Sequence, residues 1–265
     1  MDRTAKHDAW SAGQSYEHYM GRWSRRIAAE FIDRLDAPEG LDWIDIGCGT
    51  GALTATILER TNPRSVLGID PAEGFVNHAR DTIPDTRARF DVGDAQSLPT
   101  ETDSADVVAS ALAINFVPDK TAALKEMRRV VRPGGTISFY VWDYPGGGIG
   151  FIDAFWKAAA AIDPKAADLD EGARFPFCTP DGLAAMSRDA GLPVSVAPIE
   201  IETTFPSFED FWTPFTLGAG PAPGYCMSLP EHDRQRLKER LAADVGSDGP
   251  VTLVARAWAV TSEIS

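Results

Sequence analysis

The stretch that decides the fold is WIDIGCGTG, residues 43–51. An apolar run containing Asp45 ends there, and glycines follow at alternate positions, 47, 49 and 51. This pattern predicts a buried strand, a glycine loop and a helix that starts at Gly51. Gly47 permits the tight turn, while Gly49 and Gly51 leave room for a ligand and for helix packing. The helix end suits an anionic group, although a purely structural glycine turn also fits.

The segments after this loop alternate between strand and helix patterns. Such alternation predicts βαβ units and therefore an α/β fold with a mostly parallel sheet. Pro133-Gly134-Gly135 is expected to end the third helix and to turn the chain into the next strand. The expected strands cover residues 42–46, 65–70, 88–92, 105–110 and 136–142, and the expected helices cover 51–59, 72–81 and 120–131.

Outside this region, the regular alternation of strand and helix patterns does not continue. We expect a helical arm at 15–35 that is interrupted near Gly21, a helix at 179–190 with a Thr-Pro start, and a charged helix near 230–243. Residues 194–204 and 251–261 suit two further strands. The whole chain, 1–265, is interpreted as one domain, with an N-terminal arm or lid at 1–36, a ligand-binding core at 40–143, and cap insertions at 144–178 and 205–248.

Composition limits the classes of partner. The formal net charge of −14 over 265 residues disfavours nucleic acid and anionic membrane surfaces. We find neither a signal-peptide pattern nor an apolar run of the roughly 20 residues that a bilayer span needs. Cys48, Cys178 and Cys226 are odd in number and widely spaced, which favours reduced thiols. We therefore expect a cytoplasmic protein without a nucleic-acid or membrane partner, and we expect a monomer or a homodimer.

Two acids after later strands indicate the kind of ligand. Asp70 ends the second strand, 19 residues beyond Gly51, where an acid can accept hydrogen bonds from ribose hydroxyls. Asp94 follows the third strand, and an acid there can accept from an adenine amino group. Because the carboxyl ends of parallel strands share one sheet edge, the three loops together predict a nucleoside site with a small anionic group.

Asp45 separates two possible cofactors. A dinucleotide site usually has the spacing G-x-G-x-x-G, whereas this chain has G-x-G-x-G preceded by an acid. A carboxylate there would repel a pyrophosphate and attract an ammonium group. S-adenosyl-L-methionine, which combines adenosine, an amino-acid group and a sulfonium, meets all of these requirements.

The sequence resembles the class I S-adenosylmethionine-dependent methyltransferases of the type 11, small-molecule group. The resemblance covers about residues 40–143. It implies a Rossmann-like sheet of seven strands in the order 3-2-1-4-5-7-6 with helices on both faces, in which residues 251–261 fit the antiparallel last strand. The matching segments are WIDIGCGTG, GIDPAEGF (68–75), FDVGDAQSLP (90–99), SADVVASALAINFVPD (104–119) and EMRRVVRPGG (126–135). YEHYMGRWSRR (16–26) resembles an N-terminal arm of one subgroup.

The resemblance also implies roles for individual residues. Gly47, Gly49 and Gly51 would bear the methionine moiety, and Asp45 would help to hold its amino group. Asp70, beside Pro71, would bind the ribose hydroxyls, and Asp94 with the Ala95 N–H would bind adenine. The loop from Ser110 to Phe116 would lie near the amino acid and the transferable methyl. In the arm, Tyr19 and Arg22 could cap the cofactor, with the arginine pairing with its carboxylate, or the arm could merely pack on the sheet.

Methyl transfer from a sulfonium is an in-line displacement that leaves S-adenosyl-L-homocysteine, and alignment of the reactants supplies much of the acceleration. A general base is needed only for some acceptors. The candidates for catalysis are Asn115, Asp143, Tyr144 and His18. The candidates for contact with a small, partly apolar acceptor are Phe116, Trp142, Arg174, Phe175, Phe177, Phe211, Trp212 and Phe215. These aromatic residues suit the core of a cap equally well. Cys48 is interpreted as a small residue in a crowded turn.

Other functions stay open at this point. The same fold and cofactor could serve a non-transfer reaction such as cyclisation, the chain could be an NAD-dependent oxidoreductase, or it could be a binding module without activity. Asp45 and the glycine spacing argue against the oxidoreductase, and the complete cofactor motifs argue against the inactive module. The four histidines are scattered and no cysteine cluster exists, so no metal is expected.

Overall fold

The computed structural model describes residues 20–218 and 220–265. The chain divides into two compact units. The sheet unit contains residues 24–142, 177–199 and 257–265, and the helical unit contains 143–176, 200–256 and the described residues up to 23. The boundary falls inside the two long strands β6 and β7 and near the start of α3, so these elements belong to both units.

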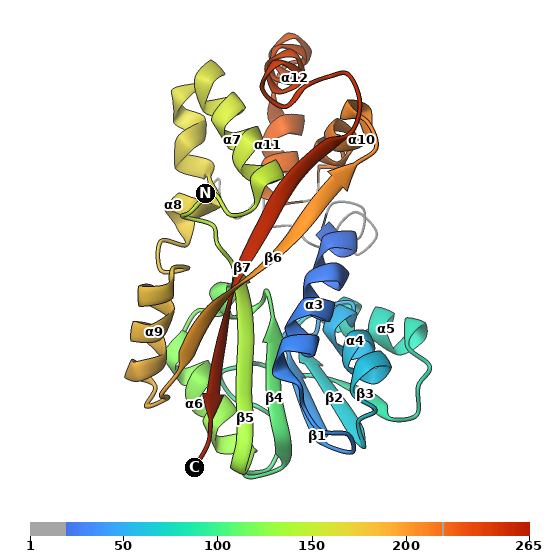
Figure 1. Ribbon diagram of the computed structural model, residues 1–265, viewed down its shortest axis with the longest axis vertical. Coiled ribbons are helices and arrows are strands. Elements are labelled where there is room, and N and C mark those ends of the chain that lie inside the picture. Colours follow the sequence, from blue (N-terminus) through green and yellow to red (C-terminus); the bar gives the residue numbers. More distant parts are fainter. Residues whose placement is uncertain (1–19, 219) are drawn as a thin grey trace. The chain divides into compact units, whose positions relative to one another are not determined.

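The sheet has seven strands in the order β3-β2-β1-β4-β5-β7-β6 (Figure 1). The pairs among β1 to β5 are parallel, and β7 pairs antiparallel with β5. The predicted order and the antiparallel last strand are therefore confirmed. The strands are β1 (Asp42–Ile46), β2 (Ser65–Asp70), β3 (Ala88–Val92), β4 (Ala105–Ala111), β5 (Val131–Trp142), β6 (Ser195–Phe205) and β7 (Val251–Glu263).

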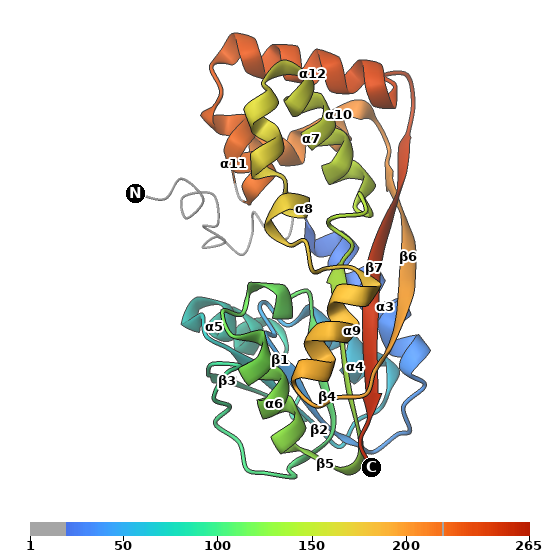
Figure 2. The same cartoon turned by 90° about the vertical axis from the view of Figure 1, so that its left-hand side faces the viewer.

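Helices cover both faces of the sheet. In Figures 1 and 2, α3, α4 and α5 lie on one face, and α6 and α9 lie on the other. The bounds are α3 (Arg22–Leu35), α4 (Ala52–Arg60), α5 (Glu73–Thr82), α6 (Lys120–Val130) and α9 (Pro180–Asp189), and a short 3-10 turn, η2 (Ile114–Phe116), follows β4. Side-chain caps fix two helix starts, because Asp119 accepts from the Ala122 N–H and Thr179 from the Gly182 N–H.

Strand β1 is central and apolar on both faces, as parallel strands covered by helices are. Trp43, Ile44 and Ile46 are all buried. The predicted strands and helices agree with the structure to within two residues at most ends. The start of β5 is an exception. Pro133-Gly134-Gly135 does not precede this strand but lies within it, as an irregularity between the pairs Ala105–Val131 and Val107–Thr136. The prediction was wrong there because a bulge allows proline and glycine inside a strand.

The helical unit is built around aromatic side chains. Phe155 stacks on Phe215 with ring centroids 4.5 Å apart, and Phe211 packs edge-on against Phe205 at 5.2 Å. Such contacts among buried rings give this unit its own core. Its helices are α7 (Gly150–Ile162), η3 (Pro164–Leu169), α8 (Glu171–Arg174), α10 (Phe208–Trp212), η4 (Thr213–Thr216), α11 (Pro221–Ser228) and α12 (Glu231–Val245).

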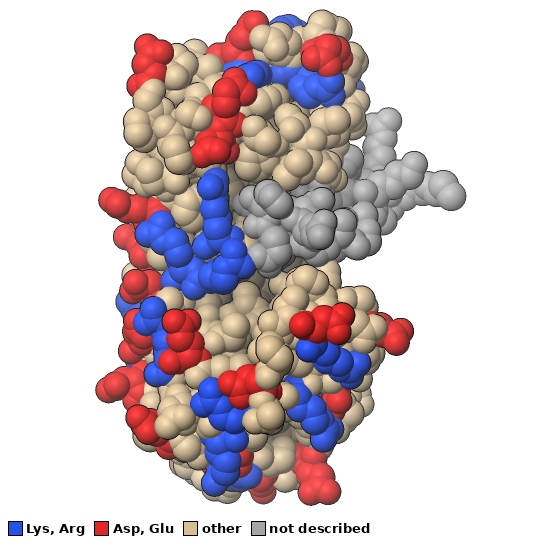
Figure 3. Space-filling model, turned by 90° about the vertical axis from the view of Figure 1, so that its right-hand side faces the viewer, with Lys and Arg blue, Asp and Glu red and all other residues tan. Residues whose placement is uncertain are grey.

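Charged side chains are mixed over the surface. Most of the face that Figure 3 shows is uncharged, and lysine and arginine lie beside aspartate and glutamate in several places on it. In the sheet unit, Arg60 and Asp33 form a surface ion pair with an N–O distance of 2.6 Å. The excess of negative charge thus does not collect in one continuous patch on this face.

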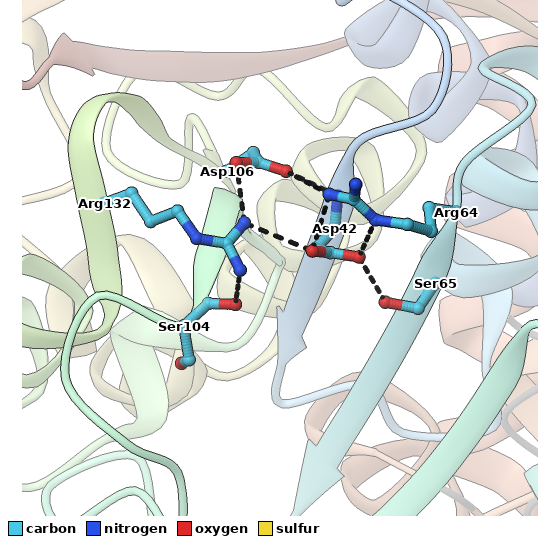
Figure 4. Close-up of polar contacts among 6 residues, drawn as sticks. All are labelled: Asp42, Arg64, Ser65, Ser104, Asp106 and Arg132. Atoms are coloured by element: carbon cyan, nitrogen blue, oxygen red, sulfur yellow. Dashed lines mark hydrogen bonds and ion pairs between the residues drawn. The ribbon is translucent and has the colours of Figure 1, made fainter.

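An ion network joins the amino-terminal ends of four strands (Figure 4). Arg132 bonds Asp106 at 2.7 Å and Asp42 at 3.1 Å, and Arg64 bonds the same two acids at 3.2 Å and 2.7 Å. Hydrogen bonds from Arg64 lower the pKa of Asp42 to about 2. The network ties β1, β2, β4 and β5 together at the edge opposite the glycine loop.

Candidate functional site

The glycine loop connects β1 to α4. Gly47 and Gly49 have φ values of 70° and 54°, in the left-handed region that favours glycine. A Cβ at Gly47 would overlap the Cβ of Ala113, whereas a Cβ at Gly49 would meet no atom of the described residues within 4 Å. Gly47 is thus required for close packing, and the backbone at Gly49 is open to an approaching ligand.

Asp45 lies in β1 and is fully buried. Its Oδ2 accepts a hydrogen bond from Thr54 Oγ1 at 2.7 Å, and its Oδ1 has no partner in the part of the chain that the structure describes. Burial raises the pKa of Asp45 to about 7, against the effect of the Thr54 hydrogen bond. A buried oxygen without a partner costs about 1–3 kcal/mol, so this carboxylate favours a cationic ligand group.

Asp70 joins the loops after the first three strands. Its Oδ2 accepts from the Gly49 N–H at 3.0 Å, and its Oδ1 accepts from the Ala72 N–H at 2.8 Å. Its backbone carbonyl accepts from the Gly93 N–H at 3.1 Å, in the loop after β3. Burial raises the pKa of Asp70, and the two backbone hydrogen bonds oppose that shift. The predicted meeting of the three loops at one edge is therefore present.

Asp94 is exposed at this edge. Gln96 caps its carboxylate, donating from its side-chain nitrogen to both oxygens at 3.0 Å and from its backbone N–H at 2.9 Å. These bonds lower the pKa of Asp94. Gln96 also accepts from the Asp119 N–H at 3.0 Å, which links the β3 loop to α6. Pro71 is exposed and Ala95 half-buried in the same loops.

The turn after β4 combines strain with unpaired polar atoms. Leu112 has a φ of 57°, which is costly for a non-glycine residue. The Asn115 side chain is 2% exposed, and neither its amide nitrogen nor its oxygen has a partner among residues 20–218 and 220–265. Ser110, by contrast, donates its hydroxyl to the Ile46 carbonyl at 2.7 Å and so joins β4 to β1. Phe116 is 41% exposed.

These residues fit the cofactor that the sequence suggests. The unpaired Oδ1 of Asp45 suits an ammonium group, and the open backbone at Gly49 admits a ligand to the loop. Asp70 and Asp94 provide acceptors for hydroxyl and amino groups at the same edge. Cys48 is buried against Val76, Ala79 and Phe90, and burial raises the pKa of its thiol, so it does not supply a thiolate nucleophile.

The aromatic residues predicted to contact the acceptor are mostly buried. Phe175, Phe211, Trp212 and Phe215 are between 0% and 6% exposed and belong to the helical unit. Their packing favours the alternative interpretation, that they form the core of a cap. Trp142 is likewise buried, at the end of β5 in the sheet unit. Phe177, also in the sheet unit, packs its ring under the ammonium group of Lys120 at 4.9 Å.

Asp143 is held in an ion pair. Arg256 donates to its Oδ2 at 2.8 Å, and the Gly146 N–H donates to its Oδ1 at 3.0 Å. Tyr144 packs on Phe175 with ring centroids 5.1 Å apart, and the Arg174 guanidinium lies 4.9 Å from the same ring. Both carboxylate oxygens of Asp143 thus have structural partners, which explains its burial. Among the other predicted residues, His18 and Tyr19 lie outside the described residues, and Arg22 begins α3.

Three residues of interest were missed from sequence. Thr54 orients Asp45, Gln96 orients Asp94, and buried Glu171 accepts from Trp156 Nε1 at 2.6 Å. Burial raises the pKa of Glu171 to about 7. A threonine in the first turn after a glycine loop is a usable signal for such a partner, but no sequence pattern pairs Glu171 with Trp156.

A separate cavity of about 310 Å³ lies at the opposite edge of the sheet unit, between the end of α3 and the turn Pro133-Gly134-Gly135. Open α/β sheets bind ligands outside the carboxyl ends of their strands, so this cavity is not the candidate site. Within the described ranges, no group of three or more potential ligands could hold a metal ion. Over the same ranges, no helix combines the length and the apolar character that crossing a membrane demands.

The strand order and the three converging loops define a class I methyltransferase fold. Comparisons with known proteins agree. Residues 44–139 match the family model described as "Methyltransferase domain". The chain is 36% identical to the 2-methyl-6-phytyl-1,4-hydroquinone methyltransferase of Synechocystis over 129 residues, which are 48% of this chain and 38% of that protein. It is also 28% identical to the trans-aconitate 2-methyltransferase of Variovorax paradoxus over 118 residues, which are 44% of this chain and 45% of that protein.

A solved structure has a fold similar to that of nearly the whole chain. The YcgJ protein of Bacillus subtilis aligns with a TM-score of 0.57 over 90% of this chain and 98% of that chain, at 15% identity. The chain spans less than half the length of the curated relatives that it matches. Residues 44–139 therefore match a methyltransferase domain, and the fold of the chain is that of the class I S-adenosylmethionine-dependent methyltransferases.

Proposed function

We propose that this protein transfers a methyl group from S-adenosyl-L-methionine to a small, partly apolar molecule. The observation that carries the proposal is the meeting of the glycine loop, Asp70 and Asp94 at one sheet edge, joined by the Gly49–Asp70 hydrogen bond of 3.0 Å. Both relatives described above are named as methyltransferases of small molecules. When bound, the cofactor supplies an electrophilic methyl group on a sulfonium.

In this proposal the residues of the sheet unit bind and orient the cofactor. Asp45, oriented by Thr54, pairs with the ammonium group, and Asp70 accepts from the ribose hydroxyls. Asp94, oriented by Gln96, accepts from the adenine amino group, and the Ala95 N–H donates to a ring nitrogen. The open backbone at Gly49 lets the methionine moiety approach the loop.

The catalytic step depends on alignment rather than on a dedicated base. Both carboxylate oxygens of Asp143 already accept hydrogen bonds, one from Arg256 and one from the Gly146 N–H. Alignment and the exclusion of water can contribute roughly 7–11 kcal/mol. Asn115, whose amide has no partner in the described chain, is the strongest remaining candidate for a polar contact near the methyl.

Acceptor choice is proposed to depend on the helical unit. The family match ends at residue 139, and nearly all of the helical unit lies beyond it. The two relatives are named for different acceptors. The trans-aconitate enzyme aligns with this chain over 118 residues and the hydroquinone enzyme over 129 residues. The matched part therefore gives the shared cofactor chemistry, and the remaining part is where acceptors are distinguished. Asp45 and the glycine spacing argue against oxidoreduction. Cyclisation stays the second candidate, because the [4+2]-cyclase SpnF aligns with this chain with a TM-score of 0.56 at 15% identity.

Two measurements test the proposal. Titration calorimetry should show S-adenosylhomocysteine binding that NADH does not compete with. Asp94→Ala should weaken that binding at least tenfold, while Glu101→Ala, which removes an exposed acid elsewhere in the sheet unit, should not. Cell extract incubated with the protein and methyl-labelled cofactor should yield a product carrying the label. Tight NADH binding without a response to S-adenosylhomocysteine would overturn the proposal.

A further inference from the structure

Arg22 rests on two aromatic rings of the helical unit. Its guanidinium carbon lies 4.4 Å from the centroid of the Trp23 ring and 4.6 Å from that of the Phe205 ring. The two rings are buried and pack on each other at 5.3 Å with an interplanar angle of 63°. Phe151 packs against both of them. The guanidinium is therefore held in place by fixed, well-packed rings.

This guanidinium forms no ion pair with any residue that the structure describes. Within residues 20–218 and 220–265 it forms no hydrogen bond or ion pair, and its Nε is buried without a partner. Asp210 acts on it through its charge without forming an ion pair. Other arginines of the chain differ, since Arg64, Arg129 and Arg132 each bond a carboxylate. In a protein with a net charge of −14, a partly buried and unpaired cation is unexpected.

The chemistry of this arrangement points to an anion. Burial lowers the pKa of Arg22, which means that the charged form has lost part of its hydration. A carboxylate replaces that hydration well, because the planar N–H edge of a guanidinium bonds both carboxylate oxygens in parallel. The neighbouring rings suit an apolar or aromatic group attached to that carboxylate. One ligand with both features would satisfy the whole arrangement.

We infer that Arg22, with Trp23 and Phe205, binds the acceptor, and that the acceptor is a small carboxylic acid with an apolar or aromatic body. The inference rests on the proposed function. The sequence suggested instead that Arg22 pairs with the carboxylate of the cofactor. The acceptor is preferred because Arg22 and its rings belong to the helical unit, whereas Asp45, Asp70 and Asp94 belong to the sheet unit.

Benzoate and its neutral counterpart benzamide provide the test. Ligand-observed NMR titration should show that the protein binds benzoate at least tenfold more tightly than benzamide. Arg22→Gln should weaken benzoate binding at least tenfold and leave benzamide binding unchanged. Arg22→Lys should give an intermediate value, because lysine keeps the charge without the planar fork. Equal binding of the two probes, or benzoate binding that Arg22→Gln does not alter, would overturn the inference.

A control variant separates local binding from total charge. Arg34 is exposed in the last turn of the same helix, so Arg34→Gln removes one charge without touching the rings. This variant should keep the wild-type affinity for benzoate. A loss equal to that of Arg22→Gln would show a general charge effect and contradict the inference. Thermal unfolding of each variant establishes that the fold is retained.

The cofactor's carboxylate is the competing source of the anion. S-adenosylhomocysteine contains it, whereas 5′-methylthioadenosine does not. Arg22→Gln should change the affinity for both by less than twofold. A tenfold loss for S-adenosylhomocysteine alone would assign Arg22 to the cofactor and overturn the inference. Absence of any S-adenosylhomocysteine binding by the wild type would defeat the proposed function instead, whatever the benzoate result.

Discussion

The hydroxyl of Thr54 donates to one carboxylate oxygen of Asp45 at 2.7 Å, and the other oxygen of that carboxylate has no partner within the described chain. Thr54 lies in the first turn of α4, so the helix that follows the glycine loop fixes the direction of the acid that precedes it. The free oxygen is then the place at which a cation can be recognised.

This relationship predicts how cofactor affinity depends on pH. The free protein holds Asp45 with a pKa of about 7, and a bound ammonium group favours the ionised carboxylate. Binding below pH 7 must therefore release a proton, and the affinity for S-adenosylhomocysteine should fall by up to about tenfold per pH unit below 7. Calorimetry between pH 5.5 and 7.5 measures the slope. Asp45→Asn should bind weakly with a flat profile, whereas Asp94→Ala should bind weakly and keep the slope. A wild-type affinity independent of pH would rule out the assignment.

Two of the glycines with open surroundings, Gly49 and Gly40, predict that stability and ligand binding can be separated. Gly49→Ala and Gly40→Ala both place a Cβ at a positive φ with no atom within 4 Å, so each should destabilise the fold by about 1 kcal/mol. Only Gly49 faces the proposed ligand. Gly49→Ala should therefore weaken S-adenosylhomocysteine binding at least tenfold, and Gly40→Ala should not. Denaturant titration and calorimetry measure the two quantities. Equal affinities in the two variants would mean that the ligand does not approach this loop.

The raised pKa of buried Glu171 predicts that the stability of the protein depends on pH. Its pKa is raised by burial from 4.5 to about 7. Between these values the folded protein keeps a proton that the unfolded chain loses, so the stability contribution of Glu171 falls as the pH rises through this window and is constant above it. Glu171→Gln, which retains an acceptor for Trp156, should be more stable than the wild type at pH 8 by up to about 3 kcal/mol, and the difference should vanish near pH 4.5. Urea unfolding at both pH values provides the check, with Glu101→Gln as an exposed control. An equal difference at both pH values would contradict the prediction.

The ion network at the amino-terminal ends of the strands predicts the opposite pH dependence of stability. Its contribution is lost as the pH falls, whereas that of Glu171 is lost as the pH rises. Hydrogen bonds from Arg64 lower the pKa of Asp42 from 3.8 to about 2, so the stabilisation is present above pH 3.8 and is lost as the pH falls towards 2. Asp42→Asn should destabilise the protein by about 1 kcal/mol at pH 7, and the difference should narrow below pH 4. Asp33→Asn breaks a single exposed pair with Arg60 and should have almost no effect. Equal losses in the two variants would show that the network adds nothing beyond an isolated surface pair.

Much of the sheet unit could be predicted from sequence, because its information is local. Strand β1 and the glycine loop are encoded within nine residues, and Asp70 and Asp94 follow their strands directly. Parallel strands then bring these loops to one edge by topology alone. The start of β5 could not be predicted, because proline and glycine after a helix indicate a turn unless the partner strand β4 absorbs them as a bulge.

The sequence by itself determined the fold class, the strand order and the loops that converge on a cofactor. The fold class and the converging loops follow from periodicity and from motifs a few residues long, and the strand order is what the resemblance to the class I methyltransferases implies. Only the tertiary structure decided that Gln96 caps Asp94, that Arg256 pairs with Asp143, and that most of the predicted acceptor aromatics are buried. It alone placed the Arg22 guanidinium on the rings of Trp23 and Phe205, with no ion pair to any described residue. The reason is physical: burial and charge pairing depend on residues up to 183 positions apart, as Arg22 and Phe205 are, and no local pattern records which distant side chain fills a given space.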